Sequence, residues 1–394
     1  MKQKLKKLKT NSNSIINVTL IIVLIVITII LSVELGKFLA IRNNQQRFEK
    51  KLITSMELTG KWFINNQTGR GDFYYQRDVK TGRVAGGYNI VRQAGSLYSL
   101  AQLYKYNHDP QIKEILENGF AFFQNNLESH DENADQLCVV YEDIKKSNSS
   151  ALLLLALIEY MEADPAAKEK YLTTAEKIAN YLMATQLENG GFIYKFEPEE
   201  IESDYNNGET FYALIRMYRL HPKEEYLSAV KKASDYFLVK YGEADKLNYS
   251  FFAWSLAGYA HLYQIEAKEE YYEFIKNYTD QYFDQRANNI IDYFNDQNEN
   301  HPSANLGVFL EGLAHSAWII KEKNPEYYQQ IKNFIEESLK YLMTLQINGP
   351  NSTRTSNYKE VRYGFCNDHN CSFLRIDLVH HNLSAIYLYL TYVK

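Results

Sequence analysis

Three carboxyl side chains lie where a polar motif meets an apolar segment. Asp204 and Glu209 are five residues apart around a glycine, and Glu311 lies in an otherwise apolar stretch. A buried carboxyl must be paired or protonated, either of which moves its pKa, and such groups serve as general acids and bases. Structural roles compete with this interpretation. Asp204 could cap a helix, Glu209 could interact favourably with a helix dipole, and Glu311 could form an ion pair with an arginine.

A fourth carboxyl has two histidines close behind it. Asp377 precedes His380 and His381 at the spacing of neighbours on one helical face. A histidine beside a carboxylate can act as a general base or acid, although a capping aspartate with a packed histidine is equally compatible. Arg92 is the one charge between residues 84 and 101. Its guanidinium could bind a carboxylate or hydroxyl groups, or form an internal ion pair.

Two alternating kinds of helix must position these side chains. Apolar residues recur at spacings of three and four in both kinds. One kind is charged on one face, which predicts outer helices at residues 44–65, 111–127, 166–187, 223–241, 268–283 and 325–347. The other kind carries little charge, which predicts buried helices at residues 88–106, 147–161, 205–220, 248–263, 303–320 and 377–393.

Six outer and six buried helices in alternation predict an all-α fold, an (α/α)6 toroid of six helical hairpins. Asp or Asn followed by Pro marks the start of several outer helices. A second repeat combines a Gln, a glycine turn and an aromatic residue, at residues 66–75, 186–194 and 346–365, and predicts short β excursions. No linker divides residues 44–394, which we expect to form one domain.

Three segments, at residues 88–98, 204–210 and 375–385, resemble segments of the six-hairpin carbohydrate-active toroids. That superfamily holds glycoside hydrolases, polysaccharide lyases and sugar epimerases. The resemblance implies a substrate cleft at the N-termini of the inner helices, where the helix dipoles favour anionic sugars. It also implies sugar binding by aromatic and polar residues that we assign to Tyr88, Arg92, Tyr205, Tyr249, Trp254 and His381.

Hydrolysis of a polysaccharide or oligosaccharide is the predicted activity, through a carboxyl pair drawn from Asp204, Glu209, Glu311 and Asp377, with His380 as a further acid or base. One alternative is a uronate epimerase or lyase, in which Arg92 neutralises the substrate carboxylate while a tyrosine or His380 takes the proton. A second alternative is a non-catalytic binding or assembly subunit beside polysaccharide synthesis or export machinery. No cofactor is expected.

The N-terminus predicts a membrane anchor. Residues 15–33 hold 15 Ile, Val or Leu and no charge, which suits one bilayer span, and five lysines precede them. We therefore predict a cytoplasmic basic tail at 1–14, a transmembrane helix at 15–34 and an extracytoplasmic domain at 44–394 in a single-pass protein of the cell membrane. A cleaved signal peptide is the rival interpretation.

Composition excludes several other classes. With 45% hydrophobic residues and a formal charge of −5, the chain is neither disordered nor a nucleic-acid binder with a broad basic face. Cys366 and Cys371 could be oxidised outside the cell, whereas Cys138 is expected to be a small buried residue. Zinc binding by Cys366, His369 and Cys371 needs more assumptions, because their spacing matches no common structural site. No metal site is therefore predicted.

Overall fold

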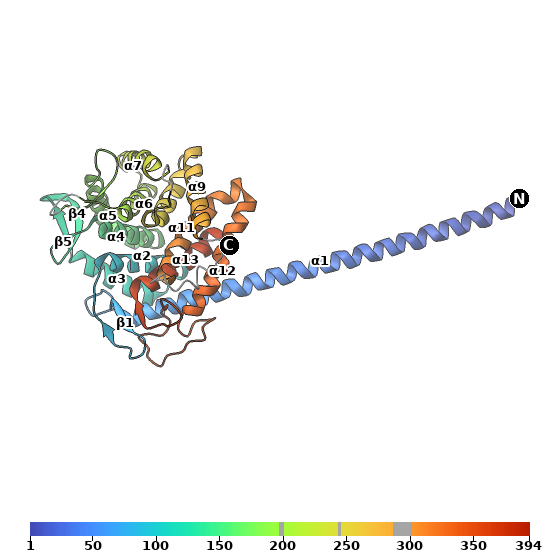
Figure 1. Ribbon diagram of the computed structural model, residues 1–394, viewed down its shortest axis with the longest axis horizontal. Helices are drawn as coiled ribbons and strands as arrows, with labels where there is room; N and C mark the ends of the chain where they lie inside the picture. Colours follow the sequence, from blue (N-terminus) through green and yellow to red (C-terminus); the bar gives the residue numbers. More distant parts are fainter. Residues whose placement is uncertain (197–200, 243–245, 287–301) are drawn as a thin grey trace. The chain divides into compact units, whose positions relative to one another are not determined.

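The structure, a computed structural model, divides into two units, Met1–Leu52 and Ile53–Lys394 (Figure 1). Helix α1 (Lys2–Asn66) contributes to both units. The backbone is described for residues 1–196, 201–242, 246–286 and 302–394, and within these ranges all side chains are described except those of residues 2–23, 25, 26, 285, 286 and 302.

The first unit is helical backbone. Among the described residues, no helix is both long enough and apolar enough to cross a bilayer. Most side chains of the predicted anchor at residues 15–34, and nearly all of those of the predicted basic tail at 1–14, lie outside the description. The anchor therefore remains a prediction.

The second unit is built on a closed ring of inner helices. Each helix packs against the next, α2 on α4, α4 on α6, α6 on α8, α8 on α11, α11 on α13, and α13 again on α2. The inner helices bury apolar and aromatic side chains together with charged ones such as Glu159, Arg216 and Glu311. Within the described residues the inner helices are α2 (Ile90–Asn107), α4 (Ser147–Ala163), α6 (Asp204–Leu220), α8 (Tyr249–Tyr263), α11 (Pro302–Lys323) and α13 (Ile376–Leu388).

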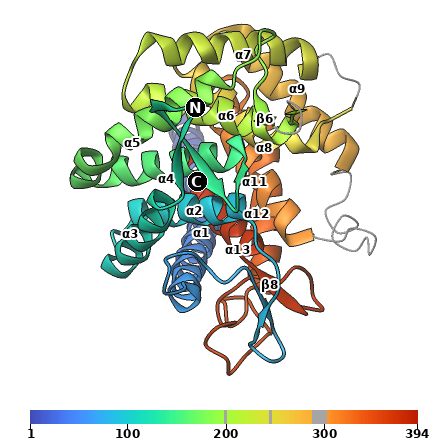
Figure 2. The ribbon, with the colours of Figure 1, turned by 90° about the vertical axis from the view of Figure 1, so that its left-hand side faces the viewer.

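Outer helices surround this ring, and Figure 2 shows α3, α5, α7 and α9 at its periphery. Residues 53–66 of α1 form the outer helix of the first hairpin. The (α/α)6 toroid predicted from the alternation of charged and apolar segments is thus confirmed. The other outer helices are α3 (Pro110–Gln124), α5 (Pro165–Ala184), α7 (Glu224–Gly242), α9 (Glu269–Arg286) and α12 (Pro325–Leu345), and a short π-helical turn η1 (Tyr389–Val393) follows α13.

Capping residues fix where several outer helices begin. The side chains of Asp109, Asp164 and Asn324 accept hydrogen bonds from backbone N–H groups of the first turns of α3, α5 and α12, at 2.8, 2.9 and 3.1 Å. A proline follows each cap, where its fixed φ suits the first helical position. The starts predicted from Asp-Pro and Asn-Pro are therefore confirmed.

The Gln repeat forms three equivalent corners between neighbouring hairpins. Each Gln makes an isolated β-bridge to an aromatic residue, in the pairs Gln67–Phe73, Gln186–Phe192 and Gln346–Phe365. Each Gln side-chain amide also donates to a backbone carbonyl of the next outer helix, with oxygen atoms of Ile115, Ala229 and Ser55 at 2.7, 2.9 and 2.9 Å. These corners tie outer helices together at the ring end where the inner helices begin.

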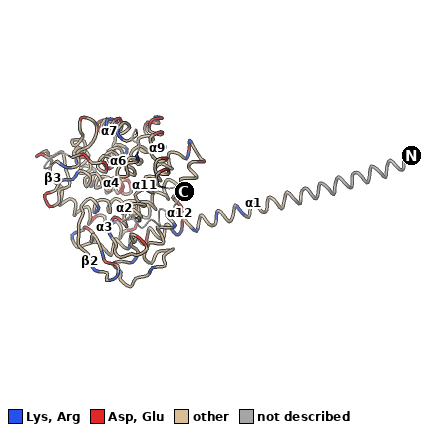
Figure 3. The backbone as a smooth tube through the Cα atoms, viewed as in Figure 1, with Lys and Arg blue, Asp and Glu red and all other residues tan. Residues whose placement is uncertain are grey.

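Short antiparallel strands cover the same end. One sheet joins β2 (Val84–Ala85), β1 (Gln76–Asp78) and β8 (Phe373–Arg375), and its Gln76–Arg375 register brings the first and last hairpins together. A second sheet, β3 (Leu127–His130), β4 (Asn133–Tyr141) and β5 (Ile144–Lys145), is an element that the sequence analysis did not predict. The third pairs β6 (Ile193–Lys195) with β7 (Ile201–Glu202). Acidic and basic positions are interspersed along this unit (Figure 3).

Candidate functional site

A cavity of about 330 Å³ lies at the N-terminal ends of the inner helices, where the sequence analysis expected a cleft. All six inner helices or their capping residues contribute to its wall. Eight of the eleven predicted site residues line it, namely Arg92, Tyr205, Glu209, Trp254, Glu311, Asp377, His380 and His381. The structure thus gathers residues that are up to 289 positions apart in the sequence.

Glu209 on α6 is the most perturbed carboxyl of the cavity wall. Its side chain is buried, and its Oε2 has no hydrogen-bond partner among the described residues. Burial raises the pKa of the Glu209 carboxyl well above its usual range, and a contact from Asn148 acts in the opposite direction. This environment favours the protonated form of the carboxyl, which is the form that can donate a proton.

Glu311 on α11 is paired with a histidine of α13. His381 Nδ1 lies 3.2 Å and 3.3 Å from the two carboxyl oxygens of Glu311. The side chains of the pair are 17% and 7% exposed, so solvent screens their interaction little. An arginine was the partner expected for Glu311, but Arg92 and Arg375 both pair with Asp377 instead.

Asp377 holds two guanidinium groups at the cavity wall. Arg375 donates Nε to Oδ1 at 2.6 Å and Nη2 to Oδ2 at 2.8 Å, and Arg92 Nε lies 3.2 Å from Oδ2. Although burial alone would raise it, the pKa of Asp377 is lowered because the Arg375 hydrogen bonds and the Arg92 charge favour the ionised form. Arg92 also donates to the Tyr75 hydroxyl.

His380 has no ion pair in the described structure, although its ring packs on that of His381, with centroids 4.2 Å apart. His380 Nδ1 lies 3.2 Å from Ser96 Oγ, and its ring packs so closely on Gly95 that an added Cβ there would be 2.9 Å from the ring. Burial lowers the pKa of His380 well below its usual value, and the positive charges of His381 and Arg92 lower it further. His380 is therefore a neutral imidazole that can accept a proton.

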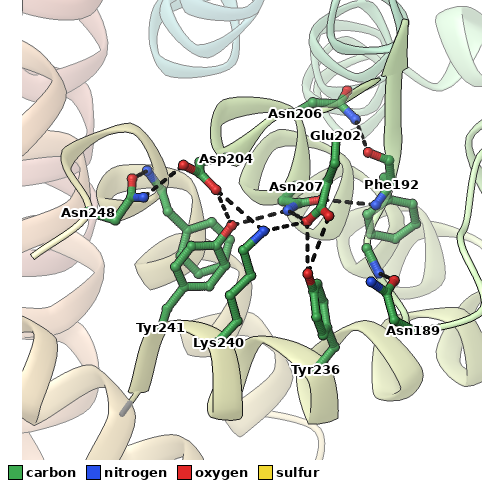
Figure 4. Close-up of polar contacts among 12 residues, drawn as sticks. Asn189, Phe192, Glu202, Asp204, Asn206, Asn207, Tyr236, Lys240, Tyr241 and Asn248 are labelled. Atoms are coloured by element: carbon green, nitrogen blue, oxygen red, sulfur yellow. Dashed lines mark hydrogen bonds and ion pairs between the residues drawn. The ribbon is translucent and has the colours of Figure 1, made fainter. Parts of the chain in front are cut away.

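Asp204 does not line the cavity, and Figure 4 shows it beside Tyr241, Lys240 and Asn248 instead. It accepts hydrogen bonds from Tyr241 Oη at 2.5 Å and Asn248 Nδ2 at 2.8 Å, and Lys240 Nζ lies 3.6 Å away. Burial opposes ionisation, but the hydrogen bonds from Tyr241 and Asn248 lower the Asp204 pKa overall. The residue joins α6 to α7 and to the start of α8, so we assign it a structural role rather than the catalytic one first expected.

Two of the expected sugar-binding tyrosines also lie outside the cavity wall. Tyr88 stacks on Tyr141 of β4, with ring centroids 4.6 Å apart. Tyr249 packs edge-on against Phe309 of α11, with centroids 5.7 Å apart. Both rings are engaged in packing between elements, and we do not retain them as sugar-binding residues.

Other residues of the wall were not predicted from the sequence. Lys146 and Asn148 come from the start of α4, Arg375 from the end of β8, and Ser384 from the interior of α13. Their positions at or near inner-helix N-termini were a usable signal for Lys146, Asn148 and Arg375. Ser384 lies two turns into its helix, where nothing in the sequence separates it from other small buried residues.

The cysteines lie elsewhere in the fold. Cys366 and Cys371 form a disulfide, and Cys138 is free and buried. Among the described residues, no group of three or more His, Cys, Asp or Glu side chains could hold a metal ion.

No family model and no curated protein matches this chain in sequence. Its similarity to known proteins is structural, and it extends over nearly the whole chain at very low identity. A Salegentibacter sp. HEL1_6 α-1,6-mannanase of glycoside hydrolase family 76, in an inactive form with two consecutive aspartates replaced and mannotriose bound, superposes with a TM-score of 0.61 and 13% identity, covering 86% of this chain and 98% of the mannanase.

Two further solved structures have the same architecture. A family 76 glycoside hydrolase (mannosidase) from Bacteroides thetaiotaomicron gives a TM-score of 0.61 and 14% identity over 87% of this chain and 98% of its own. A D-mannose isomerase gives 0.60 and 13% over 86% and 97%. These likenesses establish the six-hairpin toroid fold of carbohydrate-active proteins, and at this identity they establish the fold alone.

Proposed function

We propose that this protein is a carbohydrate-active enzyme of the glycoside hydrolase type, with Glu209 as its general acid. The observation that carries the proposal is the environment of Glu209, a buried carboxyl with a raised pKa and a partnerless oxygen at the wall of the cavity. Glycosidic bond cleavage needs a carboxylic acid that still holds its proton at the working pH.

Glu311 is the proposed second carboxyl. Glu311 lines the same cavity from α11, and its contact with His381 orients its carboxyl group. Unlike Asp377, it is not bound by arginines among the described residues. Asp377 is less suited to this role because two guanidinium groups already bind its oxygens. We assign Asp377 the positioning of Arg92 and Arg375.

This carboxyl pair differs from that of the mannanase with which the chain shares its fold. The inactive form of that mannanase lacks two consecutive aspartates. In the 394 residues of this chain no two aspartates are consecutive. Hydrolysis here would therefore use carboxyls from two separate inner helices, α6 and α11.

The test is an activity assay on the full-length protein with neutral and uronate-containing polysaccharides, measured as new reducing ends. General acid–base catalysis contributes about 10²–10⁴-fold, so Glu209→Gln and Glu311→Gln should each lower the rate by at least about a hundredfold. Glu224→Gln, at an exposed position of α7, is the matched control and should keep full activity. Unchanged hydrolysis in either cavity variant would refute its assigned role.

A sugar isomerase, epimerase or lyase is the second candidate, and His380 is the observation that favours it. The neutral imidazole lies on the same wall as Arg92, which supplies the pairing of base and cation that proton abstraction beside a carboxylate requires. The fold shared with a D-mannose isomerase is compatible with it. Solvent deuterium entering the sugar, or ultraviolet absorbance from an unsaturated uronate, would identify this chemistry in the same assay.

We further propose that the enzyme is a single-pass membrane protein acting on a polysaccharide outside the cytoplasm, beside polysaccharide synthesis or export machinery. In support, six of the eight described side chains between residues 24 and 33 of α1 are large, apolar and exposed, which is unusual for a helix in water. The Cys366–Cys371 disulfide fits an oxidising compartment.

A further inference from the structure

The charges on the cavity wall do not balance. Its three fixed cations are Arg92, Lys146 and Arg375. Asp377 carries one negative charge but pairs with two guanidinium groups, those of Arg375 and Arg92. Glu311 is paired with His381. Glu209 adds no negative charge because its burial favours the protonated form. The described part of the wall therefore carries more positive than negative charge.

Lys146 is the cation of the wall whose charge is least neutralised by nearby carboxylates. It is the N-cap residue of α4, and its Nζ lies 5.9 Å from the centre of the Tyr194 ring, another residue of the cavity wall. No ion pair joins Lys146 to a carboxylate among the described residues. The first turn of α4 contains no acidic residue either, so the positive end of the helix dipole adds to the lysine charge.

Buried polar atoms without partners lie on the same wall. Asn148 Oδ1, Glu209 Oε2 and Ser384 Oγ have no hydrogen-bond partner among the described residues, and their side chains are 9%, 4% and 1% exposed. Leaving such atoms unpaired costs free energy unless a bound molecule satisfies them. Two acceptor-capable oxygens and one protonated carboxyl suit the hydroxyl groups of a sugar.

Aromatic side chains supply the apolar part of this surface. Trp254 of α8 is buried in the wall, and Tyr205, at the start of α6, is 49% exposed. A sugar ring presents an apolar C–H face to such rings and its hydroxyl groups to polar side chains. The cavity therefore offers three kinds of contact, namely stacking, neutral hydrogen bonds and uncompensated positive charge.

We propose that the substrate is an acidic sugar, whose anionic group is held by Lys146 together with Arg92 while Asn148 and Ser384 bind its hydroxyl groups. This inference rests on the proposed function, from which it takes that the ligand is a sugar. It adds that this sugar carries a negative charge. It makes Lys146 a residue that determines specificity without taking part in bond cleavage.

The experiment compares acidic sugars with their neutral counterparts by calorimetry on the full-length protein in mild detergent. The probes are trimers of galacturonate, glucuronate and mannuronate beside the same trimers after carboxyl reduction, and glucose 6-phosphate beside glucose. The phosphate pair separates a phosphorylated sugar from a uronate. At least one acidic probe should bind about tenfold or more tightly than its neutral partner, with an affinity that falls as salt rises.

Lys146→Gln should weaken binding of that acidic probe about tenfold and leave the neutral partner unchanged, and Lys146→Arg should retain most of the affinity. Lys145→Gln is the matched control. It removes the same charge one residue earlier, from a side chain that lines a different cavity with His130, and should change affinity less than about twofold. Equal losses in Lys146→Gln and Lys145→Gln would overturn the proposal, as would equal or tighter binding of every neutral probe, or no binding of any acidic one.

The outcome separates the two proposals. Hydrolysis of a neutral polysaccharide that depends on Glu209 would leave the enzyme assignment intact and refute the acidic substrate. Tight binding of an acidic probe that depends on Lys146, with no bond cleaved and no proton exchanged, would support the acidic ligand and refute the hydrolase.

Discussion

At the scale of single residues, helix rotation decides which polar side chains reach the cavity. Asp204 and Glu209 differ by five positions, which places them about 140° apart around α6. Glu209 and Tyr205 differ by four positions and share a face, and both line the cavity. The sequence could predict that polar residues gather at this helix start. It could not predict which of them turns inward, because that depends on how α6 packs between α4 and α8.

The interaction partners of the site residues were harder to predict from the sequence than their positions on the helices. Asp377 and His381 lie four residues apart on α13, and the spacing suggested that they pair with each other. The structure instead pairs Asp377 with the arginines and His381 with Glu311. Arg92 and Glu311 come from other hairpins. Which of these side chains form ion pairs therefore depends on how the closed ring brings the hairpins together.

Glu209 should destabilise the fold in a pH-dependent way. Its folded-state pKa is raised above the 4.5 of an ordinary glutamate, so the folded protein binds the proton more tightly than the unfolded chain does. Stability is therefore highest below about pH 4.5 and falls as pH rises toward the folded pKa. Glu209→Gln removes this loss, so its stability relative to the wild type should increase as the pH rises from 5 to 8.

Thermal melting of both proteins at pH 5, 6.5 and 8 measures the effect, with Glu224→Gln as the control at an exposed position. The difference in melting temperature should grow with pH for Glu209→Gln and stay flat for the control. A constant difference would mean that Glu209 is ionised at a normal pKa in the folded state, which would also remove the basis for its role as an acid.

At the scale of elements, the helix boundaries were largely predictable because they depend on local chemistry. Asp109, Asp164 and Asn324 satisfy backbone N–H groups within their own first turns, so neighbouring sequence carries the signal. The β3–β5 sheet was missed for the opposite reason. Most of the first half of β4 is exposed, and α5 holds it through hydrogen bonds from Lys177 and Asn180 to the carbonyl oxygens of Ala134 and Asp135. No local sequence pattern predicts this contact.

Close packing between inner helices should make Gly258 of α8 hard to replace. A Cβ at this position would lie 2.3 Å from the ring of Phe211 on α6, which is fully buried. Overpacking of this kind costs about 1–3 kcal/mol and exceeds the gain of up to about 1 kcal/mol in helix propensity from Gly to Ala. Gly258→Ala should lower the urea midpoint for unfolding.

Gly242 at the end of α7 is the matched control, because its added Cβ would meet Phe274 at an ordinary 3.6 Å. Gly242→Ala should leave the urea midpoint unchanged or raise it. If Gly258→Ala behaved in the same way, the α6–α8 contact would have to be looser than the structure has it.

At the scale of the whole molecule, the two ends of the toroid differ in how their charged groups are paired. Toward the C-terminal ends of the inner helices, Arg216 of α6 bonds Glu159 of α4 at 2.6 Å, and Lys105 of α2 reaches the same carboxylate at 2.9 Å. At the N-terminal ends, the cavity wall carries Arg92, Lys146 and Arg375, and among the described residues only Asp377 pairs with these cations. A bound ligand would complete the second end, which is why we place function there.

The last prediction concerns the membrane anchor. Leu24 and Ile27 are exposed apolar side chains inside the predicted span at residues 15–34. If this segment crosses a bilayer, an aspartate near its centre costs about 2.5–3.5 kcal/mol in membrane insertion, so Leu24→Asp with Ile27→Asp should prevent it. The wild-type protein should stay in the membrane fraction after alkaline carbonate extraction, and the double variant should not. Leu24→Val with Ile27→Val, which keeps the segment apolar, should behave as the wild type. Recovery of the wild type in the carbonate supernatant would remove the anchor, and with it the argument that the enzyme meets its polysaccharide at the cell envelope, while leaving the assignments of Glu209, Glu311 and Lys146 untouched.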